Sequence, residues 1–451
     1  MSEEFETVVE RVRERVTPDA EERAQLEAVA DEVVRRAEAA IADLDVDATV
    51  VRVGSTARGT WTAGDLDVDV FVCFPADLDR ERLERLGLDV GHAVLPEGHE
   101  EYAEHPYVKG PVDGYDVDLV PCYAVDDATA AQSAVDRTPF HTRYVEERID
   151  DDLAVDVRVA KQFGKATGIY GSNLKTRGFS GYLTELLVLE YGGFRPLIEA
   201  AAEDWHPPVE FDPEDHGERT FDDPLVFVDP TDPERNVAAV VAPEAVARFQ
   251  HYARELLADP RESLFEPSEP DPIDAAAVRA AIERRGTTPV AISFDAPDLV
   301  DDQLWPQLYR SLDGVTSELD RRDFDVLRAT TFADESAVLF VELEVAERPA
   351  IERHEGPPVH VGEHARGFYE KYADTDAAGP YVDGDRYVVE RARAHPSAPD
   401  LLRSDALFDV ALGAHVESAL EEGYDVLIGD DVAALAEPFG VELARYFDPK
   451  P

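Results

Sequence analysis

Carboxylates on alternate residues follow a glycine-bounded polar stretch near the N-terminus. Residues 54–72 begin Gly-Ser-Thr-Ala-Arg-Gly and continue into an acidic and apolar alternation that contains Asp67 and Asp69. Side chains two apart on a β-strand point to one face, so these two carboxylates share a face. Neighbouring carboxylates on a half-buried strand repel each other and lose hydration, and a bound cation offsets both costs. The stretch therefore predicts a cation site, with Asp65 interpreted as a cap on the preceding turn.

The residue types indicate which cation and which substrate. Aspartate offers only oxygen, which suits Mg²⁺, an ion that takes the rest of its shell from water and phosphate. Gly54 and Ser55 precede an expected helix start, where backbone N–H groups and a hydroxyl favour an anion, and Arg58 could clamp that anion. Two metal ions about 3.5–4 Å apart beside a phosphate site are the equipment of nucleotidyl transfer.

Such a site needs a third carboxylate from a neighbouring strand. Residues 115–123 read Tyr-Asp-Val-Asp-Leu-Val-Pro-Cys-Tyr, again with acid on alternate positions. Asp118 is the preferred third carboxylate, and Asp116 on the same face is the weaker candidate.

The spacing between the Gly-Ser and Asp-x-Asp motifs, together with motifs later in the chain, resembles that of a known family. Gly-Ser, eleven residues (56 to 66) and Asp67-x-Asp69, with a later Asp, resemble the nucleotidyltransferase superfamily that includes DNA polymerase beta and poly(A) polymerase. Three further runs narrow the resemblance to the archaeal (class I) CCA-adding tRNA nucleotidyltransferases. They are Asp118-Leu-Val-Pro-Cys-Tyr123, Ala134-Val-Asp-Arg-Thr-Pro-Phe-His141, and Gly168-Ile-Tyr-Gly171 with Arg177-Gly-Phe-Ser-Gly-Tyr-Leu183.

The resemblance implies roles for individual residues. Catalysis and metal binding fall to Asp67, Asp69 and Asp118. ATP or CTP would be bound by Ser55, Arg58, His141, Lys161, Tyr170 and Arg235. A lysine point charge and a tyrosine hydroxyl are sensible phosphate ligands, although a surface lysine and a packed tyrosine remain the alternatives. His141 is either a substrate-positioning residue or a structural histidine.

Arg235 is expected to face the base of the incoming nucleotide. Cytosine and adenine present an acceptor ring nitrogen on the pairing edge, whereas uracil and guanine present N–H, so a fixed guanidinium accepts the first pair and rejects the second. The alternative is an arginine at a helix start that pairs with Glu234 or solvent.

The implied activity is template-independent addition of C, C and A to tRNA 3′ ends, from CTP and ATP with Mg²⁺. The C-terminal half would contact the acceptor stem and TΨC arm of tRNA by shape and phosphates. Two alternatives stay open: a poly(A)- or oligo(U)-type polymerase, and a catalytically inactive RNA-binding relative. A homodimer is also left open.

The charge is unusual for an RNA-binding protein. There are 98 acidic and 43 basic residues, a net charge of −55. The acid is spread along the whole chain, which indicates adaptation to the salt-saturated cytoplasm of a halophilic archaeon, where a Debye length of about 3 Å at 1 M screens self-repulsion. A disordered acidic protein is the rival interpretation. Three of the six lysines, Lys161, Lys165 and Lys175, cluster within fifteen residues.

The expected fold class is α+β in three parts. A DNA polymerase beta-like palm spans residues 1–145, a helical central domain 146–275, and an α/β RNA-binding region 276–451. A helix is expected to begin at Thr17-Pro18, and residues 360–451 are expected to be mostly helical, with a strand at Tyr387-Val-Val-Glu-Arg391. Arg321, Arg322 and Arg328 would form a basic corner. No run of 18 apolar residues predicts a membrane span, and Cys73 and Cys122 are expected to be buried thiols.

Overall fold

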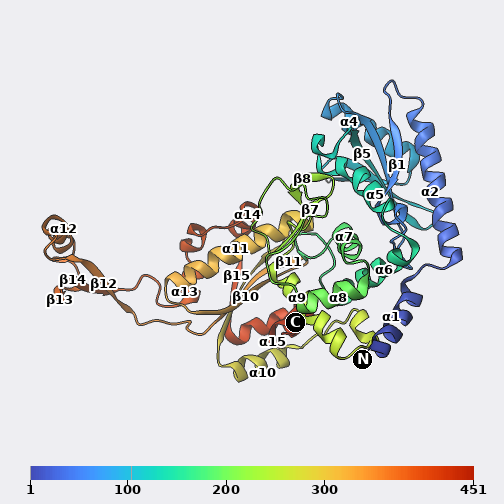
Figure 1. Cartoon of the computed structure of the whole chain (residues 1–451). Coiled ribbons are helices and arrows are strands. Elements are labelled where there is room, and N and C mark those ends of the chain that lie inside the picture. The colour runs from blue at the N-terminus through green and yellow to red at the C-terminus, as the bar shows by residue number, and fades with distance from the viewer. Residues whose placement is uncertain (1, 103) are drawn as a thin grey trace. The chain divides into compact units, whose positions relative to one another are not determined.

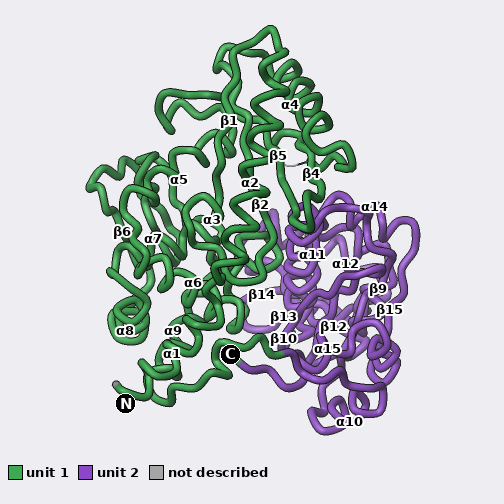
Figure 2. Tube along the Cα trace, turned by 90° about the vertical axis from the view of Figure 1, so that its right-hand side faces the viewer, with its two compact units in different colours: residues 1–268, 451 green, residues 269–450 purple. Residues whose placement is uncertain are grey.

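The computed structural model describes residues 2–102 and 104–451. The chain divides into two compact units, residues 1–268 with Pro451 and residues 269–450, which Figure 2 shows in green and purple. All the residues predicted to form the functional site belong to the first unit.

A five-stranded mixed sheet carries the acidic motifs. Its order is β1-β2-β5-β4-β3. The strands are β1 (Thr49–Val53), β2 (Asp67–Pro75), β5 (Tyr115–Ala124), β4 (Pro106–Val112) and β3 (His99–Tyr102). Strands β2 and β5 are parallel, and the other pairs are antiparallel. The two acidic strands of the sequence are therefore central neighbours.

The two faces of this sheet differ, as the alternation of β2 requires. Val68 and Val70 are fully buried and pack with α2 (Ala20–Ile41) and α4 (Arg80–Val94). Figure 1 shows both helices against the sheet. The opposite face of β2 carries Asp67 and Asp69 at its start.

The start of α2 differs from the expectation. The helix begins at Ala20, with Asp19 rather than Thr17 as its N-cap. The Asp19 carboxylate accepts hydrogen bonds from the backbone N–H groups of Glu21 and Glu22, and the Glu22 carboxylate accepts one from the Asp19 N–H. This capping box satisfies more of the free helix donors than a proline at the first helical position would.

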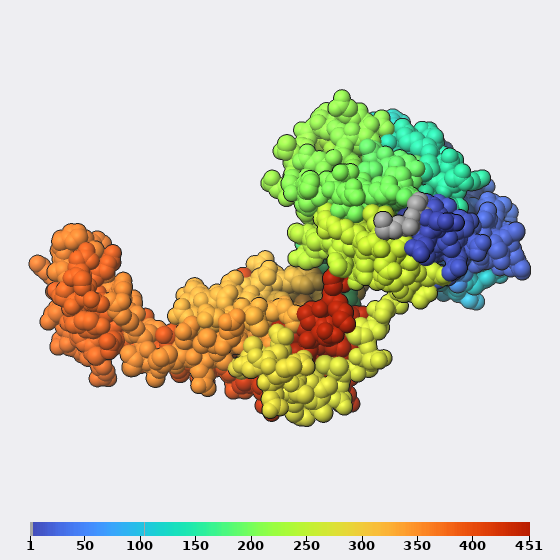
Figure 3. All heavy atoms as spheres, turned by 60° about the horizontal axis from the view of Figure 1, so that its bottom comes forward, coloured from blue at the N-terminus to red at the C-terminus, as the bar shows by residue number. Residues whose placement is uncertain are grey.

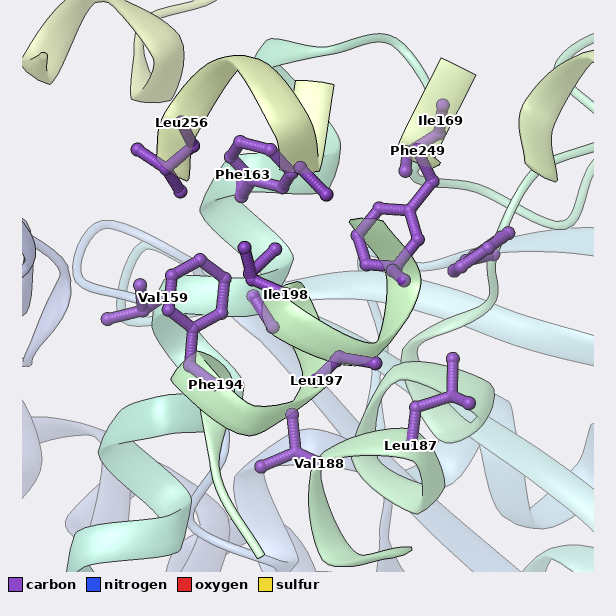
Figure 4. Close-up of a cluster of buried hydrophobic side chains, with 14 of the residues drawn as sticks. Val159, Phe163, Ile169, Leu187, Val188, Phe194, Leu197, Ile198, Phe249 and Leu256 are labelled. Carbon is purple, nitrogen blue, oxygen red and sulfur yellow. The ribbon is translucent and has the colours of Figure 1, made fainter. Parts of the chain in front are cut away.

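The rest of the first unit is mainly helical around an aromatic core. Its helices are α1 (Ser2–Val16), α3 (Gly54–Ala57), α5 (Thr138–Glu146), α6 (Asp151–Ala166), α7 (Gly181–Tyr191), α8 (Phe194–Glu203) and α9 (Pro243–Ala258), with short 3₁₀ turns at Ala128–Ala130, Ala134–Arg137 and Glu262–Phe265. Figure 4 shows Phe163, Phe194 and Phe249 among the buried side chains that join α6, α8 and α9. Continuous apolar burial of this kind fixes the helices that carry Lys161 and Glu185.

A small sheet follows these helices in the same unit. It has the order β6-β7-β8, with β6 at Val209–Phe211, β7 at Leu225–Asp229 and β8 at Asp232–Asn236. Arg235 therefore lies on a strand of a tight hairpin, and the alternative interpretation of a helix start at this arginine is wrong.

The second unit is built on the antiparallel sheet β10-β11-β9-β15. Its strands are β9 (Thr288–Asp295), β10 (Val326–Ala333), β11 (Ser336–Leu343) and β15 (Asp425–Ile428). One face packs on α11 (Asp301–Arg321) and the other on α10 (Ala275–Arg285) and α15 (Ala436–Phe447). With helices on both faces, β11 is continuously apolar from Ala337 to Val341, as the sequence indicates.

The expectation of a mostly helical 360–451 region is only partly met. A second sheet, β12-β14-β13, pairs Ile351–Pro358, Arg386–Ala392 and Ala378–Asp383, and α12 (Gly362–Tyr372) packs on it. Figures 1 and 3 show this group, in orange. Strand β13 is exposed on nearly every residue, so it lacks the apolar alternation by which a strand is recognised. The remaining helices are α13 (Ala398–Leu402) and α14 (Ala414–Glu422), with 3₁₀ turns at Asp405–Asp409 and Gly429–Leu435.

The predicted basic corner does not form. Arg321 and Arg322 both pair with Glu318 one helical turn back. Arg328 donates to the Tyr446 carbonyl and its guanidinium lies 3.8 Å from the centroid of the Tyr446 ring. One acid, Glu318, is therefore shared by two of these guanidinium groups, and the third lies against a carbonyl and an aromatic ring.

Candidate active site

Strand register brings two acidic motifs together. In the parallel pair, Asp69 lies opposite Asp118 and Asp67 lies opposite Asp116. Neighbouring strands are about 4.8 Å apart, so the carboxylates at paired positions are close neighbours. Asp67 and Asp116 are exposed, whereas Asp69 and Asp118 are partly buried. Asp65 lies before β2 and accepts hydrogen bonds from the Thr62 N–H and hydroxyl, which confirms its interpretation as a turn carboxylate.

Asp69 is the most perturbed carboxylate of this group. Burial, followed by the charges of Asp118 and Asp67, raises the pKa of Asp69 from 3.8 to about 6. Its carboxylate lies against Gly54, because a Cβ at Gly54 would be 2.0 Å from Oδ2 of Asp69. Gly54 also has φ +76°, a conformation that glycine adopts without strain. The glycine of the Gly-Ser motif therefore makes room for the second aspartate.

Lys109 on β4 supplies a positive charge to this cluster. It lies opposite Asp118 in the register, and its Nζ is 3.2 Å from Oδ1 of Asp118. Burial raises the pKa of Asp118, and Lys109 opposes that rise. Within residues 2–102 and 104–451, no group of three or more His, Cys, Asp or Glu side chains is already arranged to hold a metal ion. The carboxylate oxygens of this cluster suit a hard cation, and the Lys109 ammonium contacts one of them, on Asp118.

Arg58 and Lys161 meet on one buried acid, Glu185 of α7. Arg58 Nε is 2.7 Å from Oε2 of Glu185, and Lys161 Nζ is 3.2 Å from Oε1. Glu185 is fully buried. Burial alone would raise the pKa of Glu185, but the two cations outweigh it and lower the pKa below its ordinary value. One carboxylate thus balances two cations in a solvent-excluded place, which leaves an excess of positive charge.

The two cations differ in what they can offer a ligand. Lys161 donates to the carbonyl and hydroxyl of Thr60, at 3.1 and 3.2 Å, and to Glu185. An ammonium has three N–H groups, so these contacts use all of them. Arg58 donates through Nη1 to Thr142 and through Nη2 to Glu185, and its Nε lies 2.7 Å from Glu185 Oε2 as an ion-pair contact, which leaves one N–H group on each Nη. Two guanidinium N–H groups of Arg58 therefore remain to bind an anion.

Ser55 and Tyr170 are the other two residues predicted to hold the triphosphate. Ser55 is half-buried on the single helical turn α3. A Cβ at Gly181, the first residue of α7, would be 3.0 Å from the Tyr170 hydroxyl and 3.8 Å from Lys161 Nζ. The structure therefore brings Tyr170 and Lys161 together at the start of α7.

His141 and Arg235 converge on a second buried acid, Asp229 at the end of β7. His141 Nε2 and Arg235 Nη1 are 2.8 and 2.7 Å from the same oxygen, Oδ2. The imidazole also stacks on Tyr182, with ring centroids 4.2 Å apart. Burial lowers the pKa of His141 although Asp229 opposes this. Arg235 pairs with Asp229, so the expected alternative partner, Glu234, is not its partner.

A cavity of about 860 Å³ opens beside Arg235. Its lining includes Arg137, Ser180, Arg219 and Arg235. Glu218, Asp232 and Glu234 also line it, and Arg137 pairs with Asp232, so the three arginines are matched by three acids in the lining.

Sequence reasoning did not single out Lys109, Glu185 or Asp229. Lys109 is one of six lysines, which was a usable signal. Glu185 is a charged residue within the apolar run of residues 183–189, and a charge at a buried helical position indicates a buried partner. Asp229 precedes Pro-Thr-Asp-Pro and resembles an ordinary turn residue, so its role depends on contacts that the sequence does not display.

Comparison with known proteins covers the chain from end to end. Family models match a nucleotidyltransferase domain at residues 34–141, a tRNA nucleotidyltransferase second domain at 155–266, and a CCA-adding enzyme C-terminal domain at 285–429. The CCA-adding enzyme of Haloarcula marismortui is 65% identical, with 100% of each chain covered. The chain belongs to the CCA-adding enzyme family.

Further members of the family extend the likeness. The CCA-adding enzyme of Halorubrum lacusprofundi is 61% identical over 99% of this chain and 100% of its own. That of Halobacterium salinarum is 61% identical over 98% of each chain. These are proteins of salt-loving archaea, so the resemblance stated from the sequence is confirmed, as is the α+β nucleotidyltransferase fold.

Family membership also bears on the alternatives. The matched models and relatives support a nucleotidyltransferase of the CCA-adding kind over a homopolymer-forming polymerase. Among solved structures, the RNA terminal uridylyl transferase Cid1 covers 59% of this chain and 98% of its own, at TM-score 0.46 and 16% identity. That likeness is too remote to support an inference about function. No helix in the described ranges is long and apolar enough to cross a membrane.

Proposed function

We propose that this chain adds and repairs the 3′-terminal CCA of tRNA, using CTP and ATP without a template and releasing pyrophosphate. The observation that carries the proposal is the parallel register of β2 on β5, which pairs Asp69 with Asp118 beside the Gly54 turn. The end-to-end similarity to CCA-adding enzymes supports the same substrates. The enzyme would act in the cytoplasm; a homodimer stays a prediction.

Asp67, Asp69 and Asp118 are proposed to hold Mg²⁺. Their oxygen-only chemistry supports a hard divalent cation at this edge, as do the burial and the neighbouring carboxylates that raise the pKa of Asp69. When bound, Mg²⁺ lowers the barrier by polarising phosphate and hydroxyl oxygens. Asp118 would accept the proton of the tRNA 3′-hydroxyl or orient that hydroxyl, and Lys109 beside it would limit its basicity.

Ser55, Arg58, Lys161 and Tyr170 are proposed to hold the triphosphate. Arg58 would donate its two remaining N–H groups to phosphate oxygens. Lys161 would act through its buried charge and by fixing Thr60, because its own N–H groups are engaged. His141 and Arg235 would face the base, and Arg235 would accept cytosine and adenine through their ring acceptors.

The proposed division of labour follows the chain. Residues 1–145 would form the catalytic palm, 146–275 the central domain that contacts the nucleotide, and 276–451 the region that binds the acceptor stem and TΨC arm. Contacts to the phosphates and shape of tRNA require few sequence-specific contacts to its bases.

The test offers the purified full chain, in molar KCl with Mg²⁺, a tRNA transcript that lacks its CCA end. Labelled CTP, ATP, UTP and GTP are supplied separately and together, and the products are resolved on a sequencing gel. Two C residues, one A residue and then a stop are expected. A long product of one base, or no incorporation, would contradict the proposal.

A matched pair of variants tests the metal assignment in the same assay. Asp118→Asn is expected to reduce incorporation of both C and A by at least about 10³-fold, because it removes an anionic oxygen at the reacting centre. Asp116→Asn, two residues away on the same strand, is expected to retain activity. Equal losses in both variants would show that strand charge, rather than Asp118, is required.

A further inference from the structure

Asp229 is more completely bonded than an ordinary turn aspartate. Its Oδ2 accepts from His141 Nε2 at 2.8 Å and Arg235 Nη1 at 2.7 Å. Its Oδ1 accepts from the Thr231 N–H at 2.9 Å and the Thr231 hydroxyl at 2.8 Å. A carboxylate has about four lone-pair positions, so the four donors saturate it.

Saturation and burial decide what Asp229 can do. Its side chain has no exposure, and it is not among the residues that line the adjacent cavity. It therefore has neither the access nor the lone pairs to bind a substrate. Arg235, by contrast, lines the cavity and is 37% exposed. Of the side chains that Asp229 holds, His141 and Arg235 are the two proposed to meet the nucleotide, so its effect on a ligand passes through them.

The β7–β8 hairpin places Arg235 close to Asp229 in the chain and restricts its movement. Asp229 ends β7 and Arg235 lies on β8, and the Asp229–Thr231 hydrogen bonds close the turn between them. An exposed arginine samples many rotamers, and fixing it costs up to about 2 kcal/mol of side-chain entropy. A charged pair to an immobile carboxylate selects one guanidinium position before a ligand arrives. His141 is fixed on its other side by the Tyr182 ring.

We propose that Asp229 is a positioning residue for nucleotide selection, which holds the guanidinium of Arg235 and the ring of His141 so that the pocket distinguishes C and A from U and G. The inference rests on the role proposed above for Arg235. Discrimination between a ring acceptor and a ring N–H depends on where the donor lies, so loosening the donor should lower selectivity more than it lowers turnover.

Asp229→Asn is the direct test. All four groups that contact Asp229 donate hydrogen bonds. An asparagine amide has one accepting oxygen and one donating NH₂ group, so two of the four donors would lie against NH₂ and lose their acceptor. The ratio of correct to wrong nucleotide incorporation on tRNA lacking CCA is expected to fall about tenfold, the factor of one charged hydrogen bond. The matched control is Asp223→Asn, which alters an aspartate that accepts from the Asn236 amide at 2.9 Å, outside this cluster, and should leave the ratio unchanged.

A double-mutant cycle separates positioning from general damage. Arg235→Lys should lower the same ratio, and Asp229→Asn added to it should lower the ratio less than it does in the wild-type chain, because only the route through His141 remains. An unchanged ratio in folded Asp229→Asn, or a full second loss in the Arg235→Lys background, would overturn the inference.

Two further outcomes are distinguishable. If Asp229→Asn does not fold, Thr231→Val removes one donor to Oδ1 and should lower the ratio by a smaller factor; an unchanged ratio there overturns the inference. If the wild type makes CCA but Arg235→Lys retains selectivity, the inference fails while the proposed function stands. If the wild type adds no CCA, the proposed function itself fails.

Discussion

At the residue scale, two buried acids organise the cations expected to meet the nucleotide. Glu185 receives Arg58 and Lys161, and Asp229 receives His141 and Arg235. Removing one member of a buried pair is costlier than removing both, because the partner charge is left unsatisfied. The basic residues that sequence motifs identify therefore depend on acids that the motifs do not contain.

Asp69 differs from these two acids, because the negative charge proposed for metal binding destabilises the fold. In the folded chain its pKa is about 6, against an ordinary 3.8. The raised pKa means that ionised Asp69 destabilises the metal-free fold fully above pH 6, and that this penalty is lost as pH falls from 6 toward 3.8. Asp69→Asn should therefore abolish incorporation yet raise the free energy of unfolding at pH 7.5 by about 1–3 kcal/mol.

Denaturant melts of wild type and Asp69→Asn in molar KCl with a chelator would measure this difference. The gain should shrink between pH 6 and pH 4. A variant less stable than wild type at pH 7.5 would show that the ionised carboxylate makes favourable contacts that offset its burial.

At the element scale, the turn between β1 and β2 sets the geometry of the acidic edge. Gly54 follows β1 directly, and Asp69 of β2 pairs with Val53, the last residue of β1. Antiparallel pairing thus brings the second aspartate back against the glycine from which the motif starts.

Gly54→Ala should be severely damaging for two reasons. Its Cβ would lie 2.0 Å from Oδ2 of Asp69, and φ is +76°, so the carboxylate must move and the backbone is strained. We expect a loss of about 1–3 kcal/mol in stability and at least about 100-fold in incorporation, since small misplacements of reacting groups have effects of that size. Gly64→Ala, with φ +82° and no neighbour within 4 Å, has the strain without the clash.

The assay and a thermal melt of both variants separate the two causes. Gly64→Ala should lose stability but keep most incorporation. Similar activity losses in both variants would assign the effect to backbone strain rather than to displacement of Asp69.

Elements with strong local patterns could be predicted from the sequence. The alternation in β2 and β5 and the apolar strand β11 stand where the sequence puts them. The sequence does not predict strands β12 and β13, because β12 carries several charged residues and β13 is exposed and contains Gly and Pro, so neither shows an apolar period. The functional site shows the same division. The spacing of its aspartates and basic residues can be recognised in the sequence. Glu185, however, meets its partners across 24 to 127 residues, and Asp229 meets its partners across 6 to 88 residues.

At the scale of the whole molecule, the net charge of −55 dominates. Surface carboxylates repel one another over distances that salt shortens, from a Debye length of about 10 Å at 0.1 M to about 3 Å at 1 M. The folded chain concentrates this charge more than the unfolded chain does, so dilution of salt favours unfolding.

We therefore expect the chain to unfold or lose activity below about 1 M KCl. Thermal melts and CCA addition across 0.1–3 M KCl would measure this. Sucrose at equal osmolarity is the control, because it favours the compact state without screening charge. A cooperative melt and full activity at 0.1 M salt would contradict the prediction.

The scarcity of lysine gives the contact between Lys109 and Asp118 a practical use. Six lysines occur, and the Lys109 side chain is 28% exposed. Burial lowers its pKa, but Asp118 outweighs this and raises it, which keeps the amine protonated and slow to acylate. A divalent ion that draws Asp118 away would free a more reactive amine. Mass spectrometry would follow the acylation of Lys109 in the peptide that contains it. A faster acylation on addition of the ion, with no nucleotide present, would show that the ion binds.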